Sequence, residues 1–514
     1  MQTFEIRKPA VQSRHGLVAA QHRDAAEAGA KVLAQGGNAM DAAVVTALAL
    51  SVVEPWLSGI GGGGFLLHAD GRTGAVDTLD FNMRAPQALD PADYPLVSGE
   101  DSGNWFHWPA VVGERNVTGY GAICVPGAVA GLAAALEKYG TLRWEDALQP
   151  AIALAERGLE LDWFTCLTLA IEAPALAGFA ASAELFLDGG QAPRASDRQP
   201  PARRPMPGQA RLLQRLARAG ARDFYEGETA RRLVEDLQAG GSVLGADDLA
   251  RYQPRWRAPI TAEYRGHTVH ALDGLTGGPT FLQACAALAG ANPGRDTPAP
   301  DYALMLAGVI RAAYAQRLAT MGHAATPQAG CTSHVSVVDA SGTMVALTNT
   351  LLSRFGSRVV LPQAGILMNN GMMWFDPRPG RPNSLAPGAQ PLANMCPLIV
   401  HAQGRPWLAL GAAGGRTIFP TLLQILSGLL DRGLSLEEAF HAPRMDASSD
   451  TLRIDPRAGE AVAAALARHY PLEVAPDTVY PVCYAIPSAV QQGPQGPVGM
   501  AHPTSPWAAV AAAG

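Results

Sequence analysis

The stretch Thr332-Ser333-His334-Val335-Ser336-Val337-Val338-Asp339 is followed by Ala340-Ser341-Gly342 and then by Thr343-Met344-Val345-Ala346-Leu347-Thr348-Asn349-Thr350. Two strand-like runs joined by a short turn that contains glycine predict a β-hairpin. If residues 340–342 form the loop, Asp339 faces Thr343, and counting outward pair by pair places Thr332 opposite Thr350. Two hydroxyl groups would then meet across the ladder at the open end of the hairpin.

The two faces of this hairpin differ in chemistry. Successive side chains of a strand point to opposite faces, so an apolar set (Val335, Val337, Val345, Leu347, Leu351) separates from a polar set (Thr332, His334, Ser336, Thr348, Thr350). A threonine hydroxyl is a poor nucleophile at neutral pH and needs a base beside it. Chain cleavage before Thr332 would supply one, because a freed α-amino group has a pKa of about 7.7 to 8.0. Taken alone, Thr332 is as well explained as an ordinary β-branched strand residue.

Outward from the hairpin, the chain alternates between helical and strand-like stretches. The spacing of apolar residues predicts helices at 24–34, 41–53, 128–139, 144–157, 210–237, 302–321 and 420–430, and strands at 65–67, 75–79, 335–338, 344–352 and 408–410. Residues 187–208, rich in proline, are expected to form an exposed loop. At 514 residues the chain should form either two domains or one large multilayer α/β unit.

Composition narrows the classes of partner. A net charge of -6 gives no electrostatic basis for binding nucleic acid, so a small-molecule substrate is expected. The six cysteines show no C-x-x-C spacing, which predicts reduced thiols and neither a zinc site nor a disulfide framework. We expect no metal and no cofactor. Residues 1–17 lack an apolar signal region and no long apolar segment follows, so we expect a cytoplasmic protein without a membrane partner.

Several segments, in order along nearly the whole chain, resemble the signature blocks of the γ-glutamyltranspeptidase family. They are Gly59-Ile60-Gly61-Gly62-Gly63-Gly64-Phe65 preceded by Val53-Glu54-Pro55, Val125-Pro126-Gly127, Asp223-Phe224-Tyr225-Glu226-Gly227, Thr332-Ser333-His334 with Val337-Val338-Asp339, and Gly414-Gly415. The resemblance implies an N-terminal-nucleophile hydrolase of the α/β (α+β) class with a four-layer αββα fold. It also implies a precursor that cuts itself between Cys331 and Thr332 into a large subunit (1–331) and a small subunit (332–514), which form a heterodimer and possibly a dimer of heterodimers.

The resemblance also assigns roles to single residues. Thr332 matches the nucleophile, and Thr350 matches a second threonine that hydrogen-bonds it, in agreement with the hairpin count. Gly414 and Gly415 match the glycine pair whose backbone N–H groups form the oxyanion hole. Thr332 would attack an amide carbonyl, the amine would leave, and water or a second amine would release the acyl group.

Other positions depart from the family pattern, and all of them fall where the family recognises glutamate. Asn82 stands where the family has an arginine, with Arg84 two residues further on as a candidate replacement. Leu352 replaces an asparagine, Trp374 lies where an acidic pair is expected in the block that begins Asn369-Asn370, and Ala393 and Asn394 replace paired serines. Without a partner, a buried ammonium would cost several kcal/mol. The binding residues expected from this pattern are Asn82, Arg84, Leu352, Asn370, Trp374 and Asn394.

These departures favour hydrolysis of an amide other than a γ-glutamyl one, as in relatives that resemble oxamate amidohydrolases or cephalosporin acylases. Two alternatives stay open, namely a true γ-glutamyltransferase or glutathione hydrolase with a repacked pocket, and an uncleaved, inactive scaffold or binding protein. Gly59-x-Gly61-x-x-Gly64 formally matches a dinucleotide fingerprint but lacks the strand before and the helix after it. His334 is expected to be structural, because Ser333 and His334 point to opposite faces and cannot share a triad.

Overall fold

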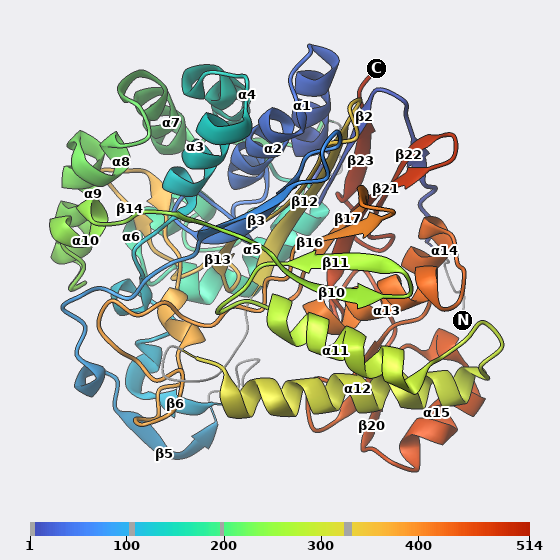
Figure 1. Cartoon of the computed structure of the whole chain (residues 1–514). Coiled ribbons are helices and arrows are strands. Elements are labelled where there is room, and N and C mark those ends of the chain that lie inside the picture. The colour runs from blue at the N-terminus through green and yellow to red at the C-terminus, as the bar shows by residue number, and fades with distance from the viewer. Residues whose placement is uncertain (1–5, 102–107, 196–199, 323–330) are drawn as a thin grey trace.

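The structure, a computed structural model, describes residues 6–101, 108–195, 200–322 and 331–514 (Figure 1). Two seven-stranded antiparallel sheets lie face to face at its centre. In spatial order the first sheet consists of β23 (Ala509–Ala512), β2 (Gly16–Ala20), β12 (Cys331–Asp339), β13 (Met344–Leu352), β3 (Gly63–Ala69), β4 (Val76–Phe81) and β9 (Arg255–Arg257). The second consists of β1 (Val11–Gln12), β22 (Gly496–Ala501), β21 (Ile486–Gly493), β17 (Arg405–Ala413), β16 (Leu398–Ala402), β11 (His267–Ala271) and β10 (Ile260–Tyr264).

Helices cover the outer face of each sheet, which completes the predicted αββα arrangement (Figure 1). The side of the first sheet carries α1 (Arg23–Ala34), α2 (Ala39–Val53), α3 (Ala128–Tyr139), α4 (Trp144–Arg157), α5 (Trp163–Leu176), α6 (Ala180–Phe186), α7 (Pro207–Ala219), α8 (Asp223–Glu226), α9 (Glu228–Ala239) and α10 (Ala246–Ala250). The side of the second sheet carries α11 (Gly278–Ala291), α12 (Ala299–Thr320), α13 (Ile418–Leu430), α14 (Leu436–His441) and α15 (Glu460–Ala467). Smaller sheets pair β5 (Leu96–Asp101) with β6 (Pro109–Val111), β7 (Leu159–Glu160) with β8 (Arg203–Arg204), β14 (Val360–Leu361) with β15 (Ile366–Leu367), and β19 (Leu452–Ile454) with β18 (Met445–Asp446) and β20 (Leu472–Val474).

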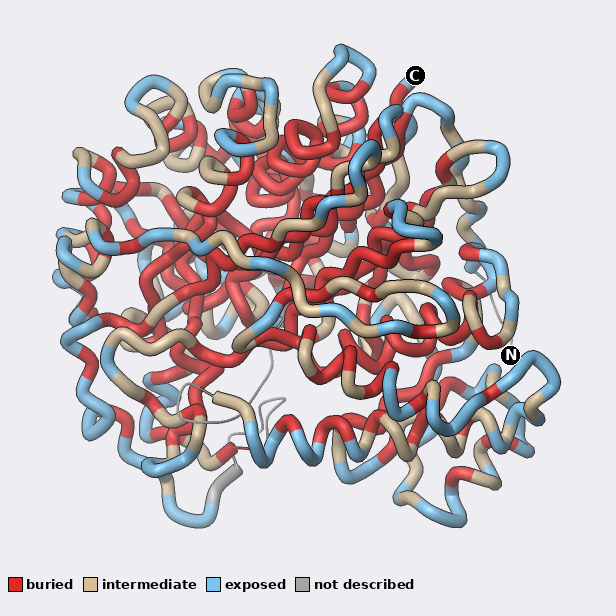
Figure 2. Tube along the Cα trace, viewed as in Figure 1, coloured by how far each residue is buried: buried red, intermediate tan, exposed pale blue. Residues whose placement is uncertain are grey.

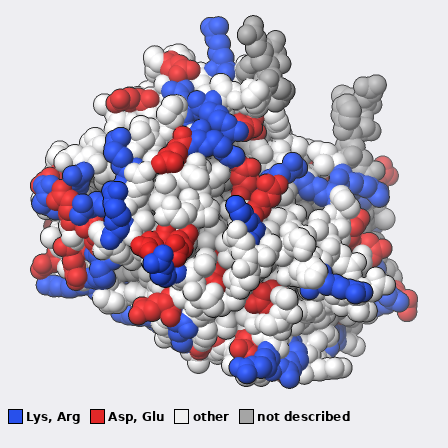
Figure 3. All heavy atoms as spheres, turned by 90° about the horizontal axis from the view of Figure 1, so that it is seen from above, with Lys and Arg blue, Asp and Glu red and all other residues white. Residues whose placement is uncertain are grey.

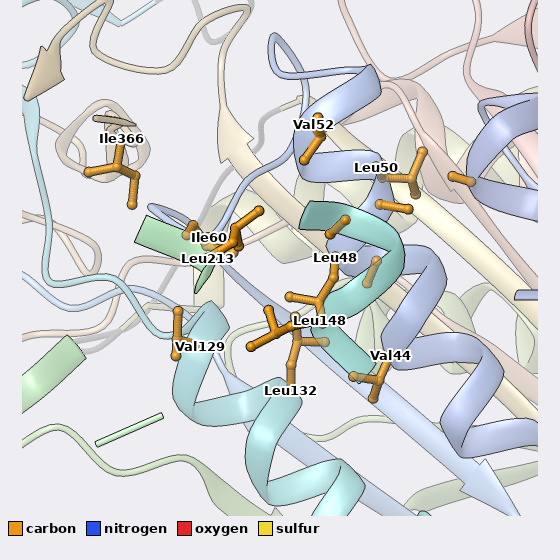
Figure 4. Packing of buried hydrophobic residues seen from close by; sticks show 14 of the residues in the cluster. Val44, Leu48, Leu50, Val52, Ile60, Val129, Leu132, Leu148, Leu213 and Ile366 are labelled. Carbon is orange, nitrogen blue, oxygen red and sulfur yellow. The ribbon is translucent and has the colours of Figure 1, made fainter. Parts of the chain in front are cut away.

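Three hydrophobic clusters fill the three spaces between these layers. Valines of the hairpin, such as Val335 and Val345, belong to the cluster under the helices, while Ala346 and Leu352 belong to the cluster between the sheets. Figure 4 shows Leu48, Leu132 and Leu148 meeting from α2, α3 and α4. All 15 residues of α2 are buried, and Figure 2 shows the buried trace running through the centre. Each large apolar side chain buried in this way contributes about 1.5 to 3 kcal/mol.

The predicted elements agree with the observed ones where amphipathic spacing is strong. The helices at 128–139 and 144–157 have the predicted bounds. The helical stretch predicted at 210–237 is divided among α7, α8 and α9, and Gly220 (φ 84°), which follows α7, explains its first break. The loop predicted at 187–208 includes the short strand β8 and the first residues of α7.

Strands from the two parts of the chain alternate within both sheets. In the first sheet, β2 of the N-terminal part lies between β23 and β12 of the C-terminal part, and β13 pairs with β3. In the second sheet, β1 pairs with β22, and β11 pairs with β16. A cut before residue 332 would therefore leave both sheets shared between the two fragments.

Among the helices of the described residues, none combines the length and the hydropathy that crossing a bilayer requires. Figure 3 shows basic and acidic side chains mixed over the face that it presents, without a continuous basic stripe there.

Candidate active site

Thr332 is the second residue of β12 and has no exposed surface. Its hydroxyl oxygen has no hydrogen-bond partner among the described residues. Thr332 nevertheless lines a pocket of about 900 Å³, part of which is open to solvent. Most buried hydroxyls are hydrogen-bonded, so an unpartnered one at the wall of a cavity is free to contact a bound molecule.

The hairpin follows the predicted register over most of its length and then departs from it. Val338 pairs with Met344, and the one-to-one pairing continues to Ser333 and Asn349. Beyond that pair the register shifts, so that Cys331 faces Leu352 and Thr332 lies opposite two residues. The predicted placement of Thr332 directly opposite Thr350 is therefore wrong, because a β-bulge shifts the register at this point.

Contacts from distant segments explain the bulge. The Leu351 N–H donates to the Leu57 carbonyl at 3.0 Å, and the Asn370 N–H donates to the Leu351 carbonyl at 3.1 Å. These bonds pull the end of β13 toward neighbouring loops. The Thr350 hydroxyl accepts the Leu352 N–H at 2.8 Å, and the expected hydrogen bond between the two threonine hydroxyls is not made in this intact chain.

The glycine-rich segment packs against β13. A Cβ atom at Gly62 would lie 1.9 Å from the Thr350 carbonyl oxygen, and one at Gly64 would lie 2.1 Å from the Thr348 carbonyl oxygen. Only glycine allows this approach of backbone to backbone. The segment follows α2 and leads into β3, which confirms that it is not a dinucleotide-binding turn.

Gly414 and Gly415 follow directly after β17, with φ angles of 139° and 59°. Gly414 lines the same pocket as Thr332, so its backbone is brought to the nucleophile candidate from the second sheet. The Gly414 carbonyl accepts hydrogen bonds from the backbone N–H and the hydroxyl of Thr417, at 3.2 and 2.8 Å. This turn fixes the orientation of the peptide units at the pocket, and their N–H groups are the donors that an oxyanion would need.

Glu54, the residue after α2, contributes a carboxyl group to the pocket. It is 4% exposed and accepts a hydrogen bond from the Ser333 hydroxyl at 3.3 Å. Burial raises the pKa of Glu54 to about 8, against the smaller lowering effect of that hydrogen bond. The carboxyl is therefore mainly protonated at neutral pH.

Aromatic rings form one wall of the pocket. Trp507 has its ring centroid 5.4 Å from that of Trp56 and 4.6 Å from that of Phe164, which it meets edge-on. Trp56 is held by its carbonyl, which accepts the Phe355 N–H at 2.8 Å. Arg354, half-buried, lies in the same pocket. The sequence does not indicate that Arg354 lies in the pocket, because nothing in residues 353–358 distinguishes Arg354 from Arg358.

His334 has a structural role, as expected. Its ring nitrogens contact the Thr348 and Ser336 hydroxyls, each at 2.9 Å. Burial lowers the pKa of His334 to about 3, so the ring is neutral. The ring packs on Gly411 of the facing sheet, where a Cβ atom would lie 2.3 Å away.

Three comparisons place the chain among known proteins. The family model described as Gamma-glutamyltranspeptidase matches residues 25–328 and 319–512. The acylase ACY 1 proenzyme of Pseudomonas sp. (strain SE83) is 35% identical over 500 residues, which cover 90% of this chain and 87% of that protein. The glutathione hydrolase proenzyme of Escherichia coli (strain K12) is 30% identical over 499 residues, covering 87% and 83%.

The chain belongs to the γ-glutamyltranspeptidase family. The solved structure of a cephalosporin acylase from Bacillus halodurans shares its fold with a TM-score of 0.88 at 24% identity, over 100% of this chain and 98% of that one. The fold is thus that of the N-terminal-nucleophile hydrolases of this family, as the signature blocks predict.

Four positions at which this chain departs from the family pattern are buried, and two of them, Leu352 and Trp374, belong to the cluster between the sheets. Asn82, Leu352, Trp374 and Asn394 are each at most 3% exposed, and none of them lines the pocket that holds Thr332. The Asn82 Oδ1, Trp374 Nε1 and Asn394 Nδ2 atoms have no hydrogen-bond partner among the described residues.

Two other expected binding residues have partners within the protein. The Asn370 amide donates to the Val117 carbonyl at 2.9 Å and the Ser353 hydroxyl at 2.7 Å, and its oxygen accepts the Ser353 N–H at 3.1 Å. Asn370 therefore holds the segment after β13 in place. Arg84 donates to the Gln390 side chain at 3.3 Å and does not line the Thr332 pocket.

Leu352 adopts a φ angle of 91°, which is unusual for a residue other than glycine or asparagine. The asparagine of the family pattern suits this backbone better than leucine does. Trp105 and Phe106, which with Trp108 are candidates for a pocket entrance in the sequence, lie outside the described residues. Trp108 is buried and belongs to the same hydrophobic cluster as Leu352 and Trp374.

Proposed function

We propose that this protein is a self-cleaving amidohydrolase in which Thr332 is the nucleophile. The observation that carries the proposal is the Thr332 hydroxyl, which is buried, has no partner among the described residues and lines a pocket together with Gly414. The protein is a hydrolase or acyltransferase of the γ-glutamyltranspeptidase family that acts on amide bonds. The relatives' names, acylase and glutathione hydrolase proenzyme, support both an amide substrate and a precursor.

The first reaction would be on the chain itself. The Thr332 hydroxyl attacks the Cys331 carbonyl carbon, the peptide C–N bond breaks, and the acyl group moves to the hydroxyl oxygen as an ester. Water then hydrolyses the ester, which gives residues 1–331 a carboxyl end and Thr332 a free amine. The two fragments would stay together as a heterodimer, because strands from both parts of the chain pair within each sheet.

Catalysis would follow from the freed amine. It accepts the Thr332 hydroxyl proton as the oxygen attacks a substrate amide, and the Gly414 and Gly415 N–H groups stabilise the oxyanion. The amine product leaves with the proton, and water hydrolyses the remaining ester. Nearby, the protonated Glu54 adds no negative charge that would oppose the developing oxyanion at neutral pH.

The substrate would not be a γ-glutamyl amide in the usual pose. A leucine, a tryptophan and two asparagines, Leu352, Trp374, Asn82 and Asn394, fill the positions at which the family pattern has groups that recognise glutamate. None of the four carries a charge that could pair with an ammonium or a carboxylate, and an unpaired buried charge costs several kcal/mol.

Denaturing electrophoresis with mass spectrometry of the purified protein tests the proposal. Fragments that end at Cys331 and begin at Thr332 are expected, together with hydrolysis of at least one simple anilide. Thr332→Ala should give a single intact chain without activity, whereas Thr332→Ser should retain both reactions at lower rates. An intact and active wild-type chain, or an active Thr332→Ala variant, would contradict the proposal.

A further inference from the structure

Arg354 has an unusual position for an arginine in the described part of the chain. It is half-buried and lines the Thr332 pocket, and it makes no hydrogen bond or ion pair with another described residue. Arg358, four residues later, contacts Glu172 at 3.1 Å and the Ser353 hydroxyl at 3.0 Å. A guanidinium has five N–H donors arranged to bind a carboxylate, so Arg354 presents donors without acceptors to the pocket.

The other ionisable groups of the pocket do not neutralise Arg354. Glu54 is mainly protonated at neutral pH because burial raises its pKa to about 8, and no ion pair joins it to Arg354. His502 faces Asp477, with 3.5 Å between its Nε2 and the Asp477 Oδ1. Tyr480 and Tyr484 are the remaining titratable side chains. In the intact chain, the described residues that line the pocket therefore present one unopposed positive charge.

The rest of the pocket is mainly apolar, and its aromatic wall of Trp56, Phe164 and Trp507 is held by ring contacts. Such a wall suits a hydrocarbon or a ring. We propose that the pocket binds a part of the amide substrate in which an apolar body carries a carboxylate, with Arg354 as the residue that binds the carboxylate. This inference names a substrate class for the proposed amidohydrolase and so rests on the proposed function.

A binding measurement tests the proposal without relying on turnover. Calorimetric titration should show that the wild-type protein binds 3-phenylpropanoate at least tenfold more tightly than 3-phenylpropanamide, since only the anion forms a charge-assisted pair. Arg354→Gln should bind the two equally. Arg354→Lys should keep part of the preference, because lysine keeps the positive charge but lacks the planar guanidinium that binds a carboxylate with two parallel hydrogen bonds. Arg211→Gln, on the exposed surface of α7, is the matched control and should behave as wild type.

Two pairs of substrates then locate the carboxylate within the amide. In one pair the carboxylate is on the acyl side, as succinyl against butanoyl 4-nitroanilide. In the other it is on the amine side, as the butanoyl amides of 4-aminobenzoate and 4-aminobenzamide. Arg354→Gln should raise KM about 10- to 100-fold for the anionic member of one pair and leave kcat nearly unchanged, as expected for lost ground-state binding.

The carboxylate site and the amidohydrolase function can be disproved independently of each other. Equal binding of phenylpropanoate and phenylpropanamide by the wild type, or a preference that survives in Arg354→Gln, would overturn the carboxylate site whatever the activity. Absence of any hydrolysis that depends on Thr332, with the binding preference intact, would overturn the amidohydrolase function and leave the carboxylate site standing.

Discussion

The two sides of Thr332 differ in packing, because one faces an open pocket and the other is filled by side chains. On one side, Arg354 and the rings of Trp56 and Trp507 line an open pocket. On the other, Leu352 and Trp374 are packed between the sheets with at most 1% of their surface exposed. Leu352 and Trp374, two positions at which this chain departs from the family pattern, lie on the packed side, whereas the unpaired charge lies on the open side.

The difference shows how a family fold can change its specificity. Under the proposed function, leucine and tryptophan would fill the subsite that takes a charged ligand end, while the candidate nucleophile Thr332 would keep its surroundings. A charge placed on the opposite wall can then select a different ligand. If the packed side is structural and the open side is free to bind, substitutions on the two sides should have different effects.

The largest effect is expected for Trp374→Ala. Removing a fully buried indole leaves a cavity, and the free energy of unfolding should fall by about 3 to 5 kcal/mol. Ile171→Ala, which shortens a side chain of the open pocket that is 38% exposed, should change it by about 0.5 kcal/mol or less. Urea unfolding of both variants measures the contrast, and similar losses would show that the two sides are equally packed.

Glu54→Gln should change how stability depends on pH. The pKa of Glu54 is raised to about 8 in the folded protein, so its stabilising contribution is complete below the unfolded pKa and is lost as pH rises through 8. The wild type should therefore lose on the order of 3 kcal/mol relative to Glu54→Gln between pH 5 and pH 9.

Chemical denaturation at those two pH values measures this difference. Glu27→Gln, on the exposed surface of α1, serves as the control and should leave the pH dependence of the wild type unchanged. Parallel curves for the wild type and Glu54→Gln would mean that the carboxyl is already ionised at neutral pH, and the pocket would then lose its unopposed positive charge.

A smaller effect is expected for Asn394→Asp on the packed side. The Asn394 Oδ1 accepts a hydrogen bond from the fully buried Arg317 at 3.0 Å, and the other acceptors of Arg317 are neutral. A carboxylate here would form a charge-assisted pair and add about 1 kcal/mol to the free energy of unfolding at pH 7.

Pairing with the guanidinium lowers the pKa of the new carboxyl in the folded protein, so this gain should persist down to about pH 4 and be lost as the pH falls below that value. Asn394→Ala, by contrast, should destabilise the protein by about 1 to 2 kcal/mol at every pH, because it removes one of the acceptors of the buried Arg317 guanidinium. Thermal unfolding at pH 7 and at about pH 3 separates the two variants, and a destabilised Asn394→Asp at pH 7 would show that this buried position does not accept a charge.

Local patterns predict much of this fold but not the geometry at the candidate nucleophile Thr332. The helices at 128–139 and 144–157 carry their own amphipathic spacing, and the hairpin register holds as far as Ser333. The bulge beyond Ser333 depends on Leu57 and Asn370, which are far away in sequence. The helices α5 and α11 are not among the predicted ones.

In the candidate site, too, some residues can be predicted from the sequence and others are revealed only by the fold. Thr332, Gly414 and the glycine-rich segment follow from signature blocks, and the resemblance that they carry is confirmed by the family. The sequence does not indicate which of Arg354 and Arg358 faces the pocket, because only the fold determines which of them forms an ion pair with Glu172. The unfavourable backbone conformation of Leu352 is likewise not predictable from the sequence and follows only from its φ angle.

The alternation of strands from 1–331 and 332–514 within each sheet constrains the order of events during synthesis. Neither piece contains a complete central sheet, since β2 and β3 need β12 and β13 as neighbours. Maturation must therefore come after folding, and two polypeptides produced from separate messages should yield insoluble halves. One continuous translation product is the folding unit, even if the finished molecule contains two chains.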